Sequence, residues 1–327
     1  MPRLTLDQID ARAFAALTRA GAADHQAGPV ARSVRLAEAD DIRSVGLGYL
    51  PTYLAHLRSG RVDGKATAKV ATPRPGAVTV DAGNGFAHPA FDAGLDALCA
   101  AAAKCGTATM TIARSYSIGV LGHPVEDIAR RGFVALAATN SPPNMTAWGG
   151  KRKVFGTNPL ALGVPRRNGE SLVIDQSSTV VTKVTLAARA AAGQPIPEGW
   201  AFDAEGQSTR DGQAALKGSM APFGGGKGAN IALLVEILGA VLAGSALSMD
   251  VAPYASAEGA PPNVGQTFVA FDPSAFAAGF HERLERLAEA MTEGGQNRLP
   301  GDRRLAARLR NARDGVEVDD DLLARLT

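Results

Sequence analysis

Cysteine is nearly absent from this sequence. Only Cys99 and Cys105 occur, both in an alanine-rich apolar segment, and their spacing is not that of metal ligands. We therefore expect two buried free thiols in a reducing compartment, and neither a disulfide nor a metal site.

The sequence also lacks any block of charge of one sign. Its 34 basic and 32 acidic residues leave a net charge of +2. No run of Lys or Arg is long enough to follow a phosphate backbone, so we expect no nucleic-acid partner.

Long hydrophobic runs are missing as well. The apolar run from Ile231 to Leu247 is interrupted by Glu236 and several glycines before it could span a bilayer, so it predicts a buried helix. The N-terminus mixes acidic and basic residues in a helical pattern, unlike a signal peptide. We expect a cytoplasmic protein without a membrane partner.

The chain of 327 residues is longer than one compact domain usually is, so two lobes are predicted. Apolar spacing from Thr5 to about Gly60 is helical, with Thr5 as N-cap, and the chain beyond Ser274 is helical again. These two ends predict one helical lobe, residues 1–75 with 275–327. Residues 76–274 are the expected α/β cofactor-binding domain.

Between the two ends, short β-branched runs alternate with helical stretches, a rhythm that predicts strands joined by crossover helices. The predicted strands are 77–83, 107–115, 132–140, 171–178 and 266–273, and the predicted helices are 88–106, 123–132, 184–193 and 224–243. Residues 195–211 are predicted to form a β-hairpin excursion.

Loops rich in Gly, Pro, Asn and Thr fill the segment 139–178 between two of these strands, and such loops offer backbone amides and hydroxyls at strand ends. Asp175 ends a strand and precedes Ser177 and Ser178, which suits a ribose, a phosphate or only the cap of the next helix. The Gly224–Gly228 turn opens a helix, so it suits an anion beside Lys227 or only a tight turn. The chain has neither a GxGxxG fingerprint after a strand nor a P-loop.

Five motifs occur in the order and spacing of a known family: DIRSVGLGYLPTYLAHLRSGRVDG, WGGKRKVFGTNPLALGVP, LVIDQSS, FGGGKGANIALLVEIL and RLPGDRR. The chain resembles the type-2 malate/L-lactate dehydrogenase family, also called sulfolactate dehydrogenase-like, over nearly its whole length. The GG-x5-GTNP run followed by IDxS is the most specific part.

This resemblance implies a non-Rossmann α/β cofactor domain with a mixed sheet that binds NAD(P)H, and a homodimer or larger assembly. The cofactor contacts that it implies are Thr157, Asn158, Pro159, Ile174, Asp175, Gln176, Ser177, Ser178, Thr179, Val180, Gly226, Lys227, Gly301, Asp302 and Arg303. It further implies reduction of 2-oxo acids or cyclic 2-imino acids.

The sequence departs from the family where proton transfer is expected. In the segment that usually reads SHGxxRxPxY, Val45 and Tyr49 replace the histidine that donates the proton and the arginine that holds the substrate carboxylate. In the segment that usually reads SxHFG, residues 115–119 carry no histidine. The SVGL variant and the sequence around His88 resemble the subgroup labelled sulfolactate dehydrogenase.

We therefore expect a relocated proton donor. His88 follows a glycine-bearing strand-to-helix turn and is the predicted acid, although a core histidine is the ordinary interpretation. Tyr49 or Tyr116 is predicted to donate a hydrogen bond to the developing alkoxide. Arg114, just past a strand, is the predicted carboxylate clamp or else a surface ion pair, with Lys153 and Arg43 in reserve.

The predicted function is an NAD(P)H-dependent oxidoreductase that interconverts a small anionic 2-oxo acid and its 2-hydroxy acid, such as sulfopyruvate and (R)-sulfolactate or a malate- or lactate-like pair. A Δ1-pyrroline- or Δ1-piperideine-2-carboxylate reductase is the first alternative, because a cyclic imine can arrive already protonated. A cofactor-binding protein with impaired catalysis is the second. The sequence does not distinguish NADH from NADPH.

Overall fold

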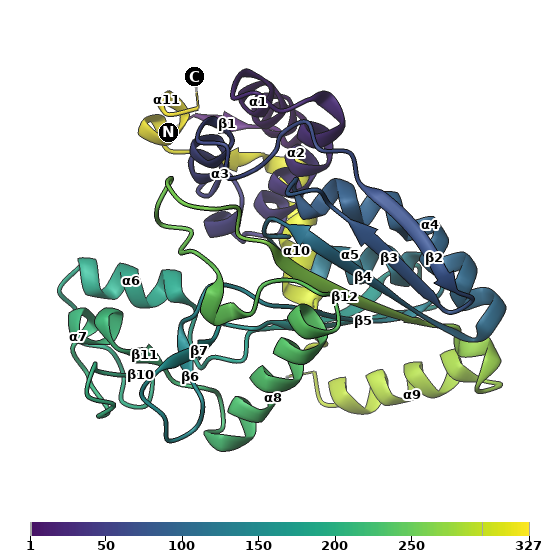
Figure 1. The fold of residues 1–327 in the computed structure, drawn as a ribbon. Coiled ribbons are helices and arrows are strands. Elements are labelled where there is room, and N and C mark those ends of the chain that lie inside the picture. Colours follow the sequence, from purple (N-terminus) through teal and green to yellow (C-terminus); the bar gives the residue numbers. More distant parts are fainter. Residues whose placement is uncertain (1, 296, 327) are drawn as a thin grey trace.

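The computed structural model describes residues 2–295 and 297–326 of the chain. Its centre is a seven-stranded sheet with strand order β2-β3-β4-β12-β5-β8-β9 (Figure 1). In that order the strands span Lys69–Arg74, Ala77–Asp81, Thr107–Ser115, Val264–Phe271, Val134–Thr139, Leu160–Pro165 and Ser171–Gln176. Strands β3 and β4 are parallel and the other neighbouring pairs are antiparallel. The expected α/β class with a mixed sheet is confirmed.

The strand directions bring the carboxyl ends of four strands to one edge of this sheet, the edge formed by strand ends. Strands β3, β4, β5 and β9 all run in the same direction. Strand β12, between β4 and β5, and strand β8, between β5 and β9, are each antiparallel to both of their neighbours. The chain enters β8 and β12 at the same edge: Leu160 lies opposite Gln176, and Val264 lies opposite Ser115. Loops from distant parts of the sequence therefore meet there.

Helices cover both faces of the sheet. Helices α4 (Ala87–Cys105) and α5 (Gly122–Arg130) pack on one face, and α8 (Gly226–Glu236) continues through the π-helical turn η2 (Ile237–Val241) on the other. Neighbouring residues of β12 contact helices on opposite faces of the sheet. Phe268 packs on Phe91 of α4 with 5.0 Å between ring centroids, whereas the Thr267 hydroxyl donates to the Leu238 carbonyl of η2 at 2.6 Å.

Both chain ends build a helical region at one end of the sheet (Figure 1). It contains α1 (Leu6–Arg19), α2 (Asp24–Ala39), the short helix η1 (Arg43–Val45), α3 (Leu50–Arg58), α10 (Asp302–Asp314) and α11 (Asp320–Ala324). Strand β1 (Arg3–Leu4) pairs with β13 (Val316–Glu317) and joins the two ends. Thr5 caps α1 in a capping box with Gln8, as predicted.

A second, four-stranded sheet stands at the left of Figure 1. Its order is β10 (Ala201–Phe202), β11 (Ser219–Met220), β6 (Met145–Thr146) and β7 (Lys153–Phe155), and α6 (Lys183–Ala191) and α7 (Gly212–Lys217) pack beside it. The predicted hairpin excursion forms around β10, where Phe202 bridges Ser208. The other three strands were not predicted.

Two elements lie outside the expected helical lobe although their residues fall within its predicted range. Strand β2 pairs with β3 in the main sheet, and α9 (Phe280–Thr292) runs beneath that sheet, tied to it by an ion pair of 2.7 Å between Arg166 and Glu285 (Figure 1). The division into residues 1–75 with 275–327 and residues 76–274 stays a prediction.

Both cysteines are free, but only Cys99 is buried, because Cys105 lies exposed at the end of α4. The expectation of two buried thiols is therefore wrong for Cys105. Within residues 2–295 and 297–326, no helix has both the length and the apolar character needed to cross a bilayer.

Candidate active site

Two of the loops predicted to hold the cofactor are bonded to each other at the sheet edge. The Ser178 amide donates to the Thr157 carbonyl at 2.8 Å, and its hydroxyl donates to the Asn158 carbonyl at 2.7 Å. Asn158 has a left-handed backbone with φ of 39°, and its side-chain amide donates to the Ala232 carbonyl at 3.0 Å and to Glu236 at 2.8 Å. The GTNP loop is thereby fixed to α8.

Burial separates the roles of these loop residues. Asn158, Ser178 and Thr179 are buried, whereas Thr157 and Ser177 are half-buried and the Val180 side chain is exposed. The buried three organise the loops, because their polar side-chain atoms are engaged within the protein. The hydroxyl groups of Thr157 and Ser177 also interact within the protein, with Ser141 at 3.3 Å and with Thr179 at 3.0 Å, so only burial separates the two groups. Contact of Thr157, Ser177 and Val180 with a cofactor stays a prediction.

Asp175, at the carboxyl end of β9, has two internal partners. Its Oδ2 atom accepts from the Gly122 amide at 2.9 Å and from Arg304 at 3.0 Å. Gly122 is the first residue of α5, so the carboxylate caps that helix and places negative charge at its positive end. The next helix, α6, is capped by Thr182 instead.

The glycine turn before α8 packs against an exposed aromatic ring. Gly224 and Gly225 have φ angles of 61° and 66°, which favour glycine. A Cβ atom on Gly225 would lie 3.0 Å from the Trp148 ring, which is itself 61% exposed. Because Gly225 has no Cβ atom, the Trp148 indole can pack against this turn. Lys227 is exposed beside it.

The turn from Gly301 to Arg303 lies beside the edge strand β9. Gly301 has φ of 100°, the Asp302 carboxylate accepts from the Leu299 amide at 2.7 Å, and Arg303 is exposed. The Val173 amide of β9 donates to the Pro300 carbonyl at 3.2 Å. Gly301 and Asp302 of this turn line a cleft together with Arg130, Arg166 and Arg308.

Two of the predicted site tyrosines lie in one aromatic cluster. Tyr49 packs edge-on against Tyr53 with 4.9 Å between ring centroids, and Tyr53 lies 5.8 Å from Tyr116. Tyr53 and Tyr116 are buried, whereas Tyr49 is partly exposed. Burial raises the pKa of Tyr49 to about 12, although the neighbouring Tyr116 hydroxyl opposes the rise. The cluster therefore offers neutral hydroxyl groups.

Arg114 lies apart from this cluster, on the surface. Its guanidinium makes two contacts with Asp81, of 2.9 and 2.5 Å, and half of the side chain is exposed. The residue is itself backbone-strained, with φ of 50°. A role as carboxylate clamp stays a prediction, and it would require this ion pair to open.

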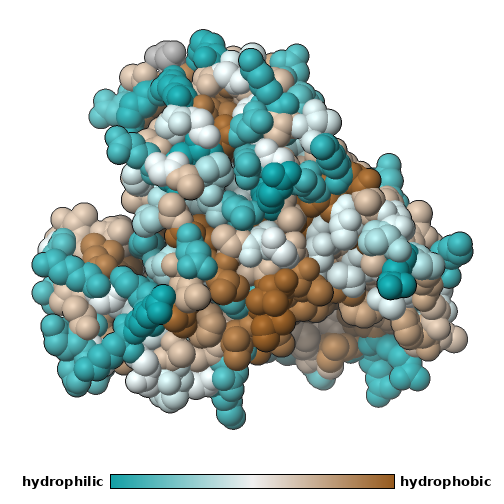
Figure 2. Space-filling model, viewed as in Figure 1, coloured by the Kyte–Doolittle hydropathy of each residue, from teal (hydrophilic) through white to brown (hydrophobic). Residues whose placement is uncertain are grey.

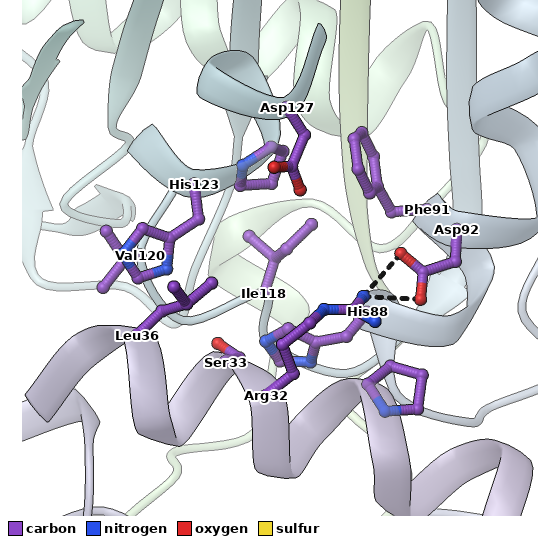
Figure 3. A pocket seen from close by; sticks show the side chains of 12 residues that line it. Arg32, Ser33, Leu36, His88, Phe91, Asp92, Ile118, Val120, His123 and Asp127 are labelled. Atoms are coloured by element: carbon purple, nitrogen blue, oxygen red, sulfur yellow. Dashed lines mark hydrogen bonds and ion pairs between the residues drawn. The ribbon is translucent and has the colours of Figure 1, made fainter. Parts of the chain in front are cut away.

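His88 lines a small cavity between α2, α4 and α5 (Figure 3). The Arg32–Asp92 ion pair stands at one side of that cavity, and His123 approaches from α5. Neither His88 ring nitrogen has a hydrogen-bond partner among the described residues, since the nearby Ile118 backbone lies outside ordinary hydrogen-bond geometry.

Burial lowers the pKa of His88 to about 3, and the positive charge of Arg32 adds to this effect. At neutral pH the ring is therefore uncharged, and an uncharged imidazole is a poor proton donor. This environment argues against His88 as the acid, and that assignment stays an untested prediction.

His56 was not predicted as a site residue, but it lies against the tyrosine cluster. His56 is buried, and its Nδ1 atom lies 2.5 Å from the Tyr116 hydroxyl. A signal for it exists, because Tyr49, Tyr53 and His56 are spaced i, i+4 and i+7 and so share one face of α3.

Comparisons with known proteins agree with this architecture. The family model for malate/L-lactate dehydrogenase matches residues 4–327. A (2R)-3-sulfolactate dehydrogenase (NADP(+)) of Chromohalobacter salexigens is 42% identical over 323 residues, covering 99% of this chain and 96% of the relative. A Δ1-pyrroline-2-carboxylate reductase of Pseudomonas fluorescens is 37% identical over 324 residues, covering 98% and 96%.

Solved structures give the same result. The Δ1-piperideine-2-carboxylate reductase from Pseudomonas syringae matches with a TM-score of 0.94 at 33% identity, covering 100% of this chain and 99% of that one. The sulfolactate dehydrogenase from Methanocaldococcus jannaschii matches with a TM-score of 0.91 at 25% identity, covering 99% and 95%. The chain belongs to the malate/L-lactate dehydrogenase family of oxidoreductases, which use a nicotinamide cofactor.

Proposed function

We propose that this enzyme interconverts a small anionic 2-oxo acid and its 2-hydroxy acid, with sulfopyruvate and (2R)-3-sulfolactate as the first candidates. The observation that carries this proposal is the identity of 42%, along nearly the whole chain, to a relative described as a (2R)-3-sulfolactate dehydrogenase. A malate- or lactate-like pair is the neighbouring choice within the same reaction class.

The loops at the sheet edge fit a dinucleotide. Thr157 and Ser177 offer hydroxyl groups there, and Val180 exposes 45% of its surface, an apolar contact for a flat ring. Lys227 stands exposed at the start of α8, and Arg304 lies beside Asp175 at the end of β9. These residues would hold NAD(P)H, whose nicotinamide supplies or accepts the hydride when bound.

The protein's own part of the reaction is to move a proton at the substrate oxygen. Val45 and Ser117 stand where the family carries histidines, so neither position supplies an imidazole. Tyr49 is the partly exposed hydroxyl of the aromatic cluster, and with a pKa of about 12 it stays protonated and able to donate a hydrogen bond. We assign the contact with the substrate oxygen to Tyr49.

A cyclic imine is the second candidate substrate. The relatives described as Δ1-pyrroline-2-carboxylate reductases are 34–37% identical, and the Pseudomonas syringae structure has a TM-score of 0.94. Such a substrate can bind as an iminium that already carries its proton, so the lack of an imidazole at Val45 matters less for it.

We further propose a homodimer that buries the outer face of α8 and η2. Five large aliphatic side chains are exposed there: Leu233 45%, Leu234 42%, Ile237 48%, Val241 59% and Leu242 55%. Figure 2 shows a continuous hydrophobic patch over these elements. The only charged residue between Lys227 and Asp250 is Glu236, which is buried, so the patch suits an equally uncharged surface such as its own copy.

Purified protein tests these proposals directly. Oxidation of (2R)-3-sulfolactate, malate and lactate with NADP+ or NAD+ is compared with reduction of Δ1-pyrroline- and Δ1-piperideine-2-carboxylate with NADPH or NADH. We expect the highest kcat/KM on a hydroxy acid. Higher kcat/KM on an imine would establish the second candidate, and nucleotide binding without any turnover would contradict both.

A further inference from the structure

Residues 247–262 form a loop whose two ends are tied together. The Ala246 amide donates to the Asn263 carbonyl at 2.9 Å, and the Asn140 side chain donates to the Ala246 carbonyl at 2.8 Å. In residues 247–262, all of which the structure describes, the short helix η3 (Ser248–Asp250) is the only helix or strand. The loop reaches the helical region near α3 and returns to β12 (Figure 1). A segment of this kind is an Ω-loop, and such loops are often functional.

The interior of the 247–262 loop is occupied by the guanidinium of Arg61. This group donates to the backbone carbonyls of Pro253 at 3.0 Å, Ala260 at 3.3 Å, Ala252 at 3.4 Å and also Ser256. Arg61 is 1% exposed, and among the described residues it forms no ion pair with a carboxylate. A guanidinium has five N–H groups in one plane, so a single side chain can bond to carbonyls from distant positions of the loop.

The side chains of the loop contribute little to holding it. From residue 253 to residue 260, every side chain is exposed except that of Tyr254, which is partly buried. Tyr254 packs on Tyr116 with 5.2 Å between ring centroids. Tyr116 in turn lies 5.8 Å from Tyr53, and Tyr53 lies 4.9 Å from Tyr49, so the loop closes on the aromatic cluster of the candidate site. The backbone contacts of Arg61 therefore determine where Tyr254 lies.

The choice of arginine at this position does more than fill space. Burying a charge without a carboxylate partner costs free energy, whereas an apolar side chain would leave the surrounding carbonyls without a donor. The Ser256 carbonyl also lies 2.8 Å from His56 Nε2, so α3 and the turn after it meet the loop at the same carbonyl. Arg61 thus defines one closed position of the 247–262 loop.

We propose that Arg61 is a positioning residue that holds the 247–262 loop closed, so that Tyr254 completes the aromatic wall of the substrate pocket to which Tyr49 belongs. Arg61 itself touches no substrate, because it is buried behind the loop. Its effect on the reaction passes through Tyr254, which supplies an apolar surface for a small substrate. This inference rests on the proposed function, in which Tyr49 contacts the substrate oxygen.

Proteolysis tests the closed loop without any substrate. Glutamyl endopeptidase cleaves after Glu258, which is exposed in the loop, but the protease needs the loop to open. Arg61→Gln should speed this cleavage at least about tenfold, since the cleavage rate follows the population of the open loop. Cleavage after Glu205, exposed in another loop, should keep its wild-type rate. An unchanged rate after Glu258, or an equal acceleration after Glu205, would overturn the proposal.

Two further variants complete this experiment. Arg58→Gln is the matched control, because Arg58 is exposed in the last turn of α3 and, within the described residues, makes no hydrogen bond to the loop. It should leave cleavage after Glu258 unchanged, and an acceleration equal to that of Arg61→Gln would overturn the proposal. Arg61→Lys serves if Arg61→Gln does not fold. It retains the charge but not the planar set of donors, so it should still speed cleavage by about threefold.

Kinetics test the role of the loop at the site, on whichever substrate the wild type turns over best. Arg61→Gln and Tyr254→Ala should each raise KM about tenfold, with kcat and cofactor affinity within about threefold of the wild type. The double variant should raise KM no further than either single variant, because both changes remove the same wall. Arg58→Gln should keep the wild-type KM.

Two kinetic results would refute the role of Arg61 at the site. One is a wild-type KM in Arg61→Gln, and the other is a KM in the double variant that multiplies the two single effects. A wild type without turnover on any hydroxy acid or imine would instead refute the proposed function, whereas cleavage after Glu258 would still decide whether Arg61 holds the loop.

Discussion

The fixation of the GTNP loop by Asn158 makes a quantitative prediction. Asn158→Ala removes one hydrogen bond to the Ala232 carbonyl and one to the Glu236 carboxylate. A neutral hydrogen bond contributes about 1 kcal/mol, and one to a charged group contributes about 1.5–3 kcal/mol. Alanine at φ of 39° adds roughly 1 kcal/mol of backbone strain. We expect a loss of about 3.5–5 kcal/mol in the free energy of unfolding.

Asn263 is the matched control for this substitution. It has the same left-handed backbone, with φ of 50°, but its Oδ1 atom has no partner among the described residues and its side chain forms no recorded hydrogen bond. Asn263→Ala should therefore cost only the strain, about 1 kcal/mol. Urea unfolding followed by tryptophan fluorescence measures both variants. If the two losses agreed within about 0.5 kcal/mol, Asn158 would not fix the loop.

Three further predictions concern packing, protonation and assembly. Gly163→Ala should lower the free energy of unfolding in urea by several kcal/mol, because its Cβ would lie 2.3 Å from a backbone oxygen of α5. Gly28→Ala, which has open space on α2, should raise the free energy of unfolding by about 0.5–1 kcal/mol. Equal effects of the two substitutions would contradict this packing. Burial lowers the pKa of His88 to about 3, against 6.5 in the unfolded chain, so its stabilising contribution is complete above pH 6.5 and is lost as the pH falls toward 3. His88→Leu should therefore reduce the loss of stability between pH 6.5 and 3. An unchanged stability profile would show that His88 does not cause this loss. Ile237→Glu should convert a dimer to monomers in analytical ultracentrifugation, whereas Leu309→Glu, at an even more exposed site on α10, should not. A dimer that survives the first change would place the interface elsewhere.

The elements with a clear period were predictable from the sequence. The strands at β3, β4, β5, β9 and β12 and the helices α4 and α5 form where β-branched runs and helical spacing placed them. The order of the strands was not predictable. Strand β12 lies between β4 and β5 although it follows them by more than a hundred residues. The sequence of a strand does not show which strand it pairs with. Strands β6, β10 and β11 have only two residues each, too few to show a period.

The sequence predicted two loops that meet at one edge of the sheet, but it did not predict the role of each residue in them. GTNP and IDQSS meet at one sheet edge as their composition suggested, yet Asn158 and Ser178 are buried and bond to the protein. A polar loop residue that fixes a turn and one that touches a ligand have the same sequence signal, and only burial separates them. The contact between His56 and Tyr116 joins residues 60 positions apart, so no motif records it.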